Sequence, residues 1–517
     1  MTTLKKLSVF VFLVLSISAQ SVAQPLSSLP HSTPEKEGVS SKAIIDFIDA
    51  VNQSKHEFHS FMFLRHGKVI AEGWWNPYSP DLKHTLYSLS KSFTSTAIGF
   101  AVSENRITVN DKVISFFPDQ LPDTVSDYLK QLRVRDLLSM SVGQAPDPTG
   151  LIGSRDTNWV KGFLALPILN QPGTKFLYNS LATYMLSAIV QKVTGQKVVD
   201  YLTPRLFTPL GIKGMDWETD PKGINTGGWG LRLRTEDIAK FAELVLQKGN
   251  WKGKQLIPEA WINEATSAKI DQAPDAPQSK KDSSDWMQGY CYQFWRSRHN
   301  TFRGDGAFGQ YALVFPDQDA VIAITSETSD MQGELNLIWQ YILPAMQDKS
   351  LQPDEKSDMA LNEKLAALKL PVPAKSDTAF AGAKIDGKQY TITTNDKHIS
   401  KIGFSEKNHT YLLTLQTDGK DYTIPFGKNK WIESKTDRFG PSLVAPIKHH
   451  FVGLPASQVA GLYVWKDNKT LEMQLRYIDS PHSEKMIFHF DNNNVSIDYS
   501  QSFDPPGKKI VLEGQAN

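Results

Sequence analysis

Ser88 and Lys91 are the residues whose types and spacing first suggest chemistry. They stand in the run Ser88-Leu89-Ser90-Lys91, and positions i and i+3 of a helix share a face, so the serine hydroxyl and the lysine amine can meet. A serine becomes a nucleophile when a neighbouring base takes its proton. A lysine can be that base if burial lowers its pKa from about 10.4, and the apolar run at residues 97–102 favours burial. The spacing alone also fits an ordinary capped helix start.

A second segment makes the pattern specific. It reads Pro-Gly-Thr-Lys-Phe-Leu-Tyr-Asn-Ser over residues 172–180, and the helix expected after it ends in Thr-Gly. Together with Ser-x-x-Lys, this arrangement resembles the serine β-lactamase and penicillin-binding protein superfamily. The chain resembles most the class C β-lactamase-related serine hydrolases, which include esterases and amidases such as 6-aminohexanoate-dimer hydrolase. Residues 132–139 and 227–231 agree with that family too, and the likeness covers about residues 30–346.

The resemblance assigns roles to three further positions. Tyr178 would share a proton with Ser88 and Lys91, its phenolate being favoured beside the ammonium although its unperturbed pKa is about 10. Ser180 stands where the family often has Asn and would bond to Lys91 or to a substrate carbonyl. Trp229 is a candidate for the wall of a substrate pocket. The alternatives are a tyrosine packed beneath a loop and a tryptophan packed in the core.

The family's third motif, Lys-Thr-Gly on a strand, is missing. Residues 301–311 take its place, and by carry-over the backbone N–H of Gly304 would join that of Ser88 as an oxyanion hole. Arg303 could replace the missing cation, although Asp305 nearby would oppose it. Both could equally be turn residues with solvated charges. We expect His84, four residues before Ser88, to be structural.

Composition narrows the function classes. The chain has 517 residues, 56 basic and 55 acidic side chains, and 40% hydrophobic residues, which indicates two or more globular domains. No basic stripe suggests a nucleic-acid partner. No cluster has metal-ligand spacing and no nucleotide-binding fingerprint occurs, so no metal and no cofactor are expected. The lone Cys291 is expected to be buried and inert.

The first residues read as a targeting segment. Lys5 and Lys6 precede an apolar stretch at residues 7–17, and Ser21-Val22-Ala23 forms a small-residue cleavage site. We therefore expect residues 1–23 to be a signal peptide and the protein to be secreted or periplasmic, with no membrane span after cleavage. A retained N-terminal anchor is the alternative.

The pattern of the remaining chain predicts an α/β (α+β) fold. Strands are expected at both ends of residues 24–347 with helices between them, which indicates an antiparallel sheet flanked by helices with an inserted helical subdomain. A charged, Pro-containing linker is expected at 348–378. Period-2 alternation over 379–517 predicts a C-terminal antiparallel β domain.

These expectations combine into an exported serine hydrolase that cleaves a small-molecule ester or amide through an acyl-enzyme on Ser88. Two alternatives stay open at this point. One is a β-lactamase or D-alanyl-D-alanine peptidase, and the other is a catalytically silent binding protein of the same fold. The sequence leaves the oligomeric state open.

Overall fold

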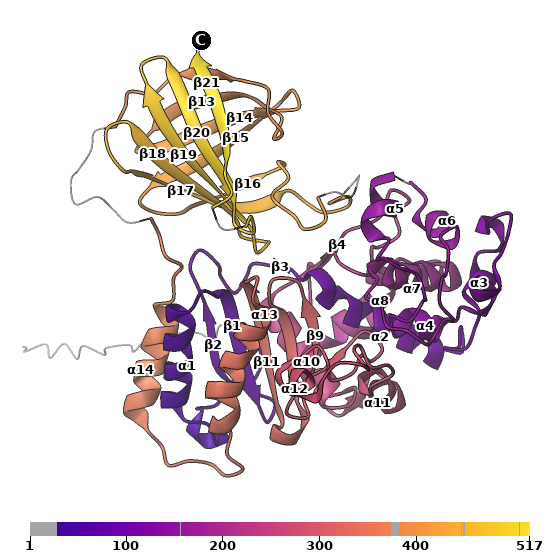
Figure 1. Ribbon diagram of the computed structural model, residues 1–517. Coiled ribbons are helices and arrows are strands. Elements are labelled where there is room, and N and C mark those ends of the chain that lie inside the picture. The colour runs from indigo at the N-terminus through magenta and orange to yellow at the C-terminus, as the bar shows by residue number, and fades with distance from the viewer. Residues whose placement is uncertain (1–27, 156, 374–381, 446, 448–449, 506) are drawn as a thin grey trace, which may run out of the picture.

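The computed structural model describes residues 28–155, 157–373, 382–445, 447, 450–505 and 507–517. The expected signal peptide lies outside these residues. The described chain forms a sheet domain, a helical lobe beside it and a β barrel above both (Figure 1). None of the described helices is long and apolar enough to cross a membrane.

The sheet domain is built from segments far apart in the sequence. Its six antiparallel strands run in the order β2-β1-β11-β10-β9-β8. They are β2 (Lys68–Trp74), β1 (Glu57–Arg65), β11 (Ala320–Glu327), β10 (Gln310–Phe315), β9 (Phe302–Gly306) and β8 (Trp295–Arg296). His66 and Gly67, both with positive φ, form the tight turn between β1 and β2, as expected for a two-residue hairpin loop.

Helices cover both faces of this sheet. Alternate side chains of β1 point to opposite faces, so Phe61 and Phe63 join one apolar core while Met62 and Leu64 join the other. The first core packs against α1 (Ser41–Gln53), α13 (Met331–Leu337) and the π-helical turn Ile338–Ile342 that continues α13. The second packs against α2 (Ser90–Ser103) and α10 (Thr235–Leu246). The expected fold class is thereby confirmed.

The inserted helical lobe lies beside the sheet domain (Figure 1). It contains α3 (Asp127–Gln131), α4 (Val134–Leu138), α5 (Thr149–Arg155), α6 (Trp159–Leu164), α7 (Ser180–Thr194) and α8 (Val198–Leu202). Helix α7 packs against both α2 and α4. This contact brings the start of α7 to the start of α2, where Ser88 and Lys91 lie.

Most of the expected linker is part of the sheet domain. Helix α14 (Glu355–Ala366) lies against α1 (Figure 1), with Lys364 paired to Asp49. Leu361 and Leu368 are buried in the same core as α1. The composition of this segment suggested a linker, but its few apolar residues suffice to bury one face.

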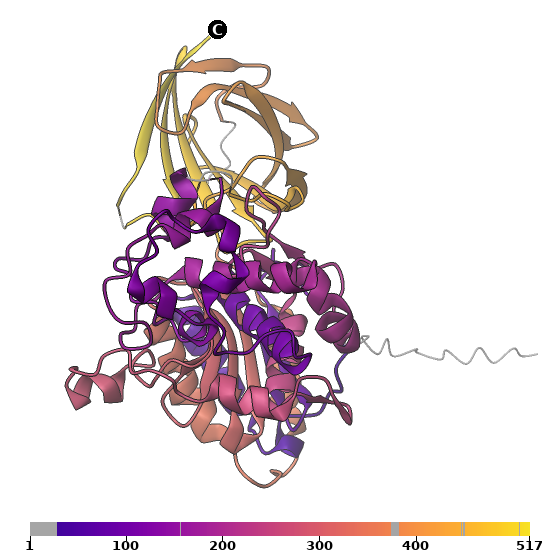
Figure 2. The same cartoon turned by 90° about the vertical axis from the view of Figure 1, so that its right-hand side faces the viewer.

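The C-terminal domain is an all-β barrel (Figures 1 and 2). Its strands are β12 (Gln389–Ile392), β13 (Ile399–Lys407), β14 (Thr410–Thr417), β15 (Lys420–Lys428), β16 (Ile432–Thr436), β17 (Ser457–Trp465), β18 (Thr470–Tyr477), β19 (Ser483–Asp491), β20 (Asn494–Gln501) and β21 (Ile510–Ala516). Neighbours pair antiparallel, and β15 also pairs with β17 in parallel, which closes the sheet. The inward-facing apolar residues form one core.

Candidate active site

Ser88 lies in a 3-10 turn, η2 (Tyr87–Leu89), that leads directly into α2. The flanking side chains Leu86, Leu89 and Phe93 are fully buried, whereas Ser88 is only partly buried. Tyr87 has a φ of 46°, a left-handed conformation that bulky residues rarely adopt. The turn therefore presents the serine at the end of a helix whose remaining residues are anchored in the core.

Lys91 is hydrogen-bonded to three parts of the site. Its Nζ lies 3.0 Å from Ser88 Oγ, 3.0 Å from Ser180 Oγ and 2.7 Å from the carbonyl oxygen of Gly228. The i, i+3 spacing accounts for the first contact. The other two come from α7 and from the loop before β5 (Leu231–Leu233), which tertiary folding brings to the same amine.

Burial changes the acid–base chemistry of Lys91. The side chain is 2% exposed, and desolvation lowers its pKa from 10.5 to about 7, with Asp147 and Asp305 acting in the opposite direction. Near neutral pH a substantial fraction of the amine is unprotonated and can accept a proton from Ser88.

Tyr178 lies beside this pair but does not become the anion. Burial raises the pKa of its phenol, Asp305 raises it further, and a hydrogen bond with Ser88 opposes both effects. The Lys91 Nζ lies 4.9 Å from the centre of the Tyr178 ring, and the ring stacks on Trp295 with centroids 5.6 Å apart. The structure thus differs from the expected phenolate: Tyr178 keeps its proton, and Lys91 is the group that gives one up.

The start of α7 fixes Ser180. The preceding residue, Asn179, caps the helix by accepting a bond from the N–H of Ala182 at 3.2 Å. Its amide nitrogen donates to Gln144 Oε1 at 2.8 Å. A capped first turn places Ser180 at the first helical position with its hydroxyl at Lys91.

Gly228 is a further candidate position, which sequence reasoning did not assign. A Cβ there would lie 2.8 Å from the Ser180 carbonyl oxygen and 3.5 Å from Lys91 Nζ, so the loop approaches this closely because the residue is glycine. The adjoining Trp229 is 4% exposed and packs on Trp159 with ring centroids 5.8 Å apart. Trp229 therefore belongs to the core behind the site, not to an open pocket wall.

Strand β9 runs along residues 86–92, which we call the nucleophile turn because they carry the candidate nucleophile Ser88. A Cβ on Gly304 would lie 2.4 Å from Leu89 Cδ1 and 2.7 Å from Ser92 Oγ. A Cβ on Gly306 would lie 2.0 Å from the carbonyl oxygen of Leu86. The two glycines let the strand backbone lie directly against residues 86–92, on both sides of Ser88.

Arg303 and Asp305 form an ion pair below the site. The Arg303 Nη2 and Asp305 Oδ2 atoms are 2.9 Å apart, and both side chains are almost fully buried. Arg303 also donates to the carbonyl oxygen of Asp285 at 2.9 Å and lies over the ring of Trp286 at 4.4 Å. Both alternatives from the sequence are therefore wrong: these are not solvated turn charges, and the buried Arg303 does not present a replacement cation to a substrate.

His84 and Cys291 lie outside the candidate cluster of Ser88, Lys91 and Tyr178. The Nε2 of His84 lies 3.0 Å from Nδ1 of the buried His59, and burial lowers the pKa of His84 well below its usual value. Cys291 is fully buried, its Sγ donates to the Thr266 carbonyl oxygen at 3.3 Å, and burial raises the pKa of its thiol to about 12. A protonated, enclosed thiol is a poor nucleophile.

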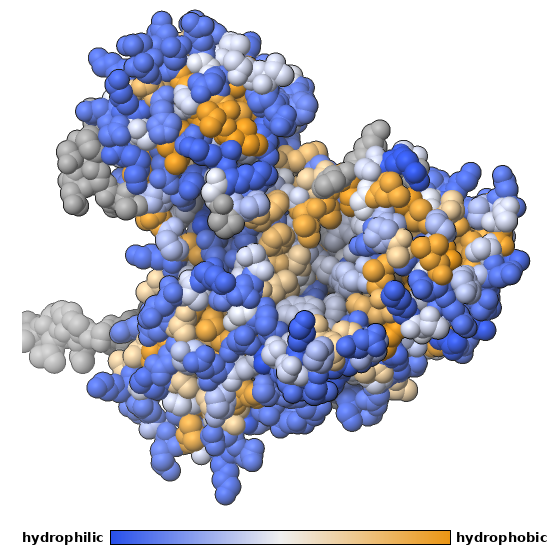
Figure 3. Space-filling model, viewed as in Figure 1, coloured by the Kyte–Doolittle hydropathy of each residue, from blue (hydrophilic) through white to orange (hydrophobic). Residues whose placement is uncertain are grey.

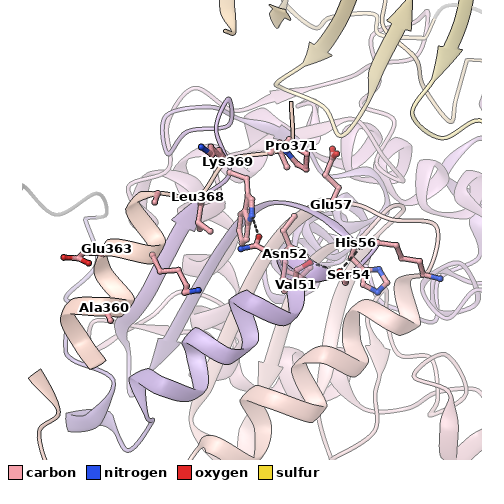
Figure 4. Close-up of a pocket in the computed structure, with 16 residues that line it drawn as sticks. Val51, Asn52, Ser54, His56, Glu57, Ala360, Glu363, Leu368, Lys369 and Pro371 are labelled. Carbon is pink, nitrogen blue, oxygen red and sulfur yellow. Dashed lines mark hydrogen bonds between the residues drawn. The ribbon is translucent and has the colours of Figure 1, made fainter. Parts of the chain in front are cut away.

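A separate pocket of about 740 Å³ lies between α1, α14 and the start of β1 (Figure 4). Its labelled wall residues include Asn52, His56 and Glu363, but Ser88 does not line it. Within the described ranges, no group of three or more His, Cys, Asp or Glu side chains is arranged to hold a metal ion.

Comparisons with known proteins show what this chain is similar to. A family model described as Beta-lactamase matches residues 54–347, more than half of the chain. A 6-aminohexanoate-dimer hydrolase from Paenarthrobacter ureafaciens is 26% identical over 289 residues, which cover 52% of this chain and 73% of that protein. A protein of Escherichia coli strain K12 named "Putative D-alanyl-D-alanine carboxypeptidase" is 30% identical over 143 residues, which cover 25% of this chain and 33% of that protein.

The fold is also found among solved structures. The structure named "Putative 6-aminohexanoate-dimer hydrolase from Bacillus anthracis" superposes with a TM-score of 0.51 at 20% identity. The superposition covers 63% of this chain and 89% of that chain.

Proposed function

This chain belongs to the β-lactamase family of serine hydrolases, and we propose that it is an exported esterase that works through a Ser88 acyl-enzyme. One observation carries the proposal. The buried Lys91, with a pKa lowered to about 7, has its Nζ 3.0 Å from the Ser88 hydroxyl oxygen. An unprotonated amine at that distance is a general base for a serine nucleophile.

The proposed acylation step uses Ser88 as the nucleophile and Lys91 and Tyr178 as the proton-transfer groups. Ser88 Oγ forms a bond to the ester carbonyl carbon while its proton passes to Lys91. The backbone N–H groups of Ser88 and Gly304 hold the oxyanion. The bond to the leaving oxygen then breaks, the alkoxide takes the phenol proton of Tyr178, and the Lys91 ammonium returns a proton to Tyr178. Water attacks the acyl carbon next and gives one proton to Lys91. The bond between that carbon and Ser88 Oγ then breaks, the acid leaves, and the Lys91 ammonium returns its proton to Ser88 Oγ.

The protonated state of Tyr178 supports its role as donor. Burial and Asp305 raise the pKa of the phenol, so it arrives at the reaction with a proton to give. Ser180, whose hydroxyl lies 3.0 Å from Lys91 Nζ, would hold the amine in place. Trp229 supports the loop that carries the Gly228 carbonyl.

The position of Arg303 favours esters over β-lactams. In the superfamily the Lys of Lys-Thr-Gly helps to hold the carboxylate that β-lactams and wall peptides carry. Here Arg303 is fully buried and forms an ion pair with Asp305. Losing a charge-assisted hydrogen bond to a carboxylate costs about 1.5–3 kcal/mol, or about one to two powers of ten in specificity. An uncharged ester needs no such contact.

Two measurements test the proposal. A fluorophosphonate probe should label the wild-type protein and not Ser88→Ala. Ser95→Ala is the matched control, since Ser95 is a buried hydroxyl of the same helix with no side-chain hydrogen-bond partner, and it should label like wild type. Absence of labelling in the wild type would indicate a silent binding protein.

The substrate class is tested separately. The kcat/KM for a p-nitrophenyl acyl ester should exceed that for a chromogenic cephalosporin under the same conditions. The reverse order would favour a β-lactamase or a D-alanyl-D-alanine peptidase. Export rests on the pattern of residues 1–23, and N-terminal sequencing of the mature protein should find cleavage after Ala23.

A further inference from the structure

The turn between β18 and β19 of the barrel reaches the chain segment just before the nucleophile. The carbonyl oxygen of Asp479 accepts bonds from Thr85 N–H at 2.9 Å and from Thr85 Oγ1 at 3.1 Å. The Asp479 carboxylate pairs with Arg232 at 2.8 Å, and the carbonyl oxygen of Ser480 accepts from Tyr78 OH at 3.1 Å. The C-terminal domain is therefore fastened to the hydrolase domain three residues before Ser88.

His482, the last residue of this turn, contacts the nucleophile turn itself. Its Nε2 lies 2.5 Å from the phenol oxygen of Tyr87, and its Nδ1 lies 2.6 Å from Glu327 Oε1 at the end of β11. The histidine side chain is fully buried and its ring is enclosed by Phe308 and Phe503. A carboxylate at Nδ1 selects the tautomer that carries its proton on Nδ1, so Nε2 accepts a hydrogen bond from the Tyr87 hydroxyl.

Tyr87 needs such an anchor because of its backbone. Its φ of 46° is unfavourable for a side chain with a Cβ, and residues in this region persist only when their surroundings hold them there. Tyr87 is 4% exposed. Its phenol oxygen also accepts a hydrogen bond from the N–H of Leu443 at 3.4 Å. Burial raises the pKa of Tyr87, so the phenol remains a donor to His482.

We propose that His482 is a positioning residue of the active site, delivered by the C-terminal β domain. Its imidazole, bound to Glu327, accepts the hydrogen bond of the Tyr87 phenol. This contact holds the left-handed turn that sets the Ser88 hydroxyl oxygen 3.0 Å from Lys91 Nζ. This inference rests on the proposed function of Ser88. It gives the barrel a role in catalysis that acts through Tyr87.

The test is a double-mutant cycle on the full chain. Tyr87→Phe removes the hydroxyl and keeps the ring, while His482→Ala removes its partner. Each should lower the rate of fluorophosphonate labelling and the ester kcat by about tenfold, the effect of losing one buried hydrogen bond, with KM nearly unchanged. The double variant should be no slower than the single variants, because both remove the same contact.

Two further variants separate positioning from stability. His482→Gln should recover most of the rate, since the amide oxygen can accept the Tyr87 proton. Tyr499→Phe is the matched control: Tyr499 is a buried tyrosine of the same domain that donates to Glu484 at 2.7 Å, and its loss should lower Tm without slowing labelling.

Each outcome decides the matter. A labelled wild type with unchanged rates in Tyr87→Phe and His482→Ala would overturn the positioning role and leave the proposed function standing. Additive losses, or an equal loss in Tyr499→Phe, would also overturn it. A wild type that is not labelled would overturn both proposals.

Discussion

Replacing Lys91 by Met should stabilise the protein while abolishing its activity. The pKa of Lys91 falls from 10.5 to about 7 on folding, a difference of about 3.5 units. At 1.36 kcal/mol per unit, the folded state bears a penalty of about 5 kcal/mol for burying this amine at low pH. Methionine has a similar length and no charge, so Lys91→Met removes the penalty together with the general base.

The penalty depends on pH in a defined direction. Below pH 7 the amine is charged in both the folded and the unfolded states, and the full penalty applies. Between about pH 7 and 10.5 only the unfolded state still binds the proton, so the penalty shrinks as pH rises. The stability advantage of Lys91→Met over wild type should therefore be about 3 kcal/mol smaller at pH 9.5 than at pH 6.5.

Thermal unfolding of both proteins at these two pH values measures the effect. For a domain of this size, 1 kcal/mol corresponds to about 2 °C, so the difference in Tm should narrow by about 6 °C. Lys240→Met is the control, since Lys240 is also buried but pairs with Glu236 at 2.9 Å, and its loss should lower Tm at both pH values. In the wild type, kcat/KM should rise with pH up to about 7 as Lys91 loses its proton.

A Tm difference between Lys91→Met and wild type that is the same at pH 6.5 and 9.5 would refute this reasoning. That result would mean that Lys91 is a well-solvated or paired ammonium in the folded protein, which cannot act as a base at neutral pH. A lower Tm of the variant at both pH values, with the expected narrowing absent, would have the same meaning.

Other variants probe the rest of the chain. Cys291→Ala should keep ester kcat/KM within about twofold, since the enclosed thiol has a raised pKa; a loss as large as that of Ser88→Ala would indicate thiol chemistry. Arg476→Ala should lower the unfolding free energy in denaturant titrations by about 3 kcal/mol, because Arg476 binds Glu57 across the domain interface with two contacts of 2.6 and 3.0 Å. The double variant with Glu57→Gln should recover part of this loss. An unchanged unfolding free energy in Arg476→Ala would show that the interface is solvated. Gly304→Ala should slow fluorophosphonate labelling, because its Cβ would displace the nucleophile turn. Limited proteolysis should leave α14 uncut, and early cutting there would mean that it does not dock on α1.

Local patterns predicted much of the fold. The β1–β2 hairpin follows from two β-rich runs around His66-Gly67, and the alternation beyond residue 379 predicted antiparallel strands. The closure of those strands into a barrel was not predictable, because it depends on the parallel pairing of β15 with β17, whose residues 427 and 462 are far apart in the sequence. The sequence predicted a short helix at residues 361–368 within a linker, but not that this helix (α14) packs on α1. Its composition is that of a linker, and only the surface of α1 provides its apolar face with a partner.

The same division applies to the site. The sequence determined that Ser88 and Lys91 meet, because the 3-10 turn that runs into the start of α2 brings residues three apart to the same face. The motif at Tyr178 and Ser180 determined which residues accompany them. Tertiary structure decided the acid–base behaviour of these groups. Burial lowers the pKa of Lys91 and raises that of Tyr178, so Lys91 is the group that loses its proton near neutral pH and Tyr178 stays protonated. Tertiary structure also enclosed Arg303 and brought His482 to Tyr87 across 395 residues. Spacing sets contacts within one turn, whereas pKa values and ion pairs depend on the solvent that distant segments exclude.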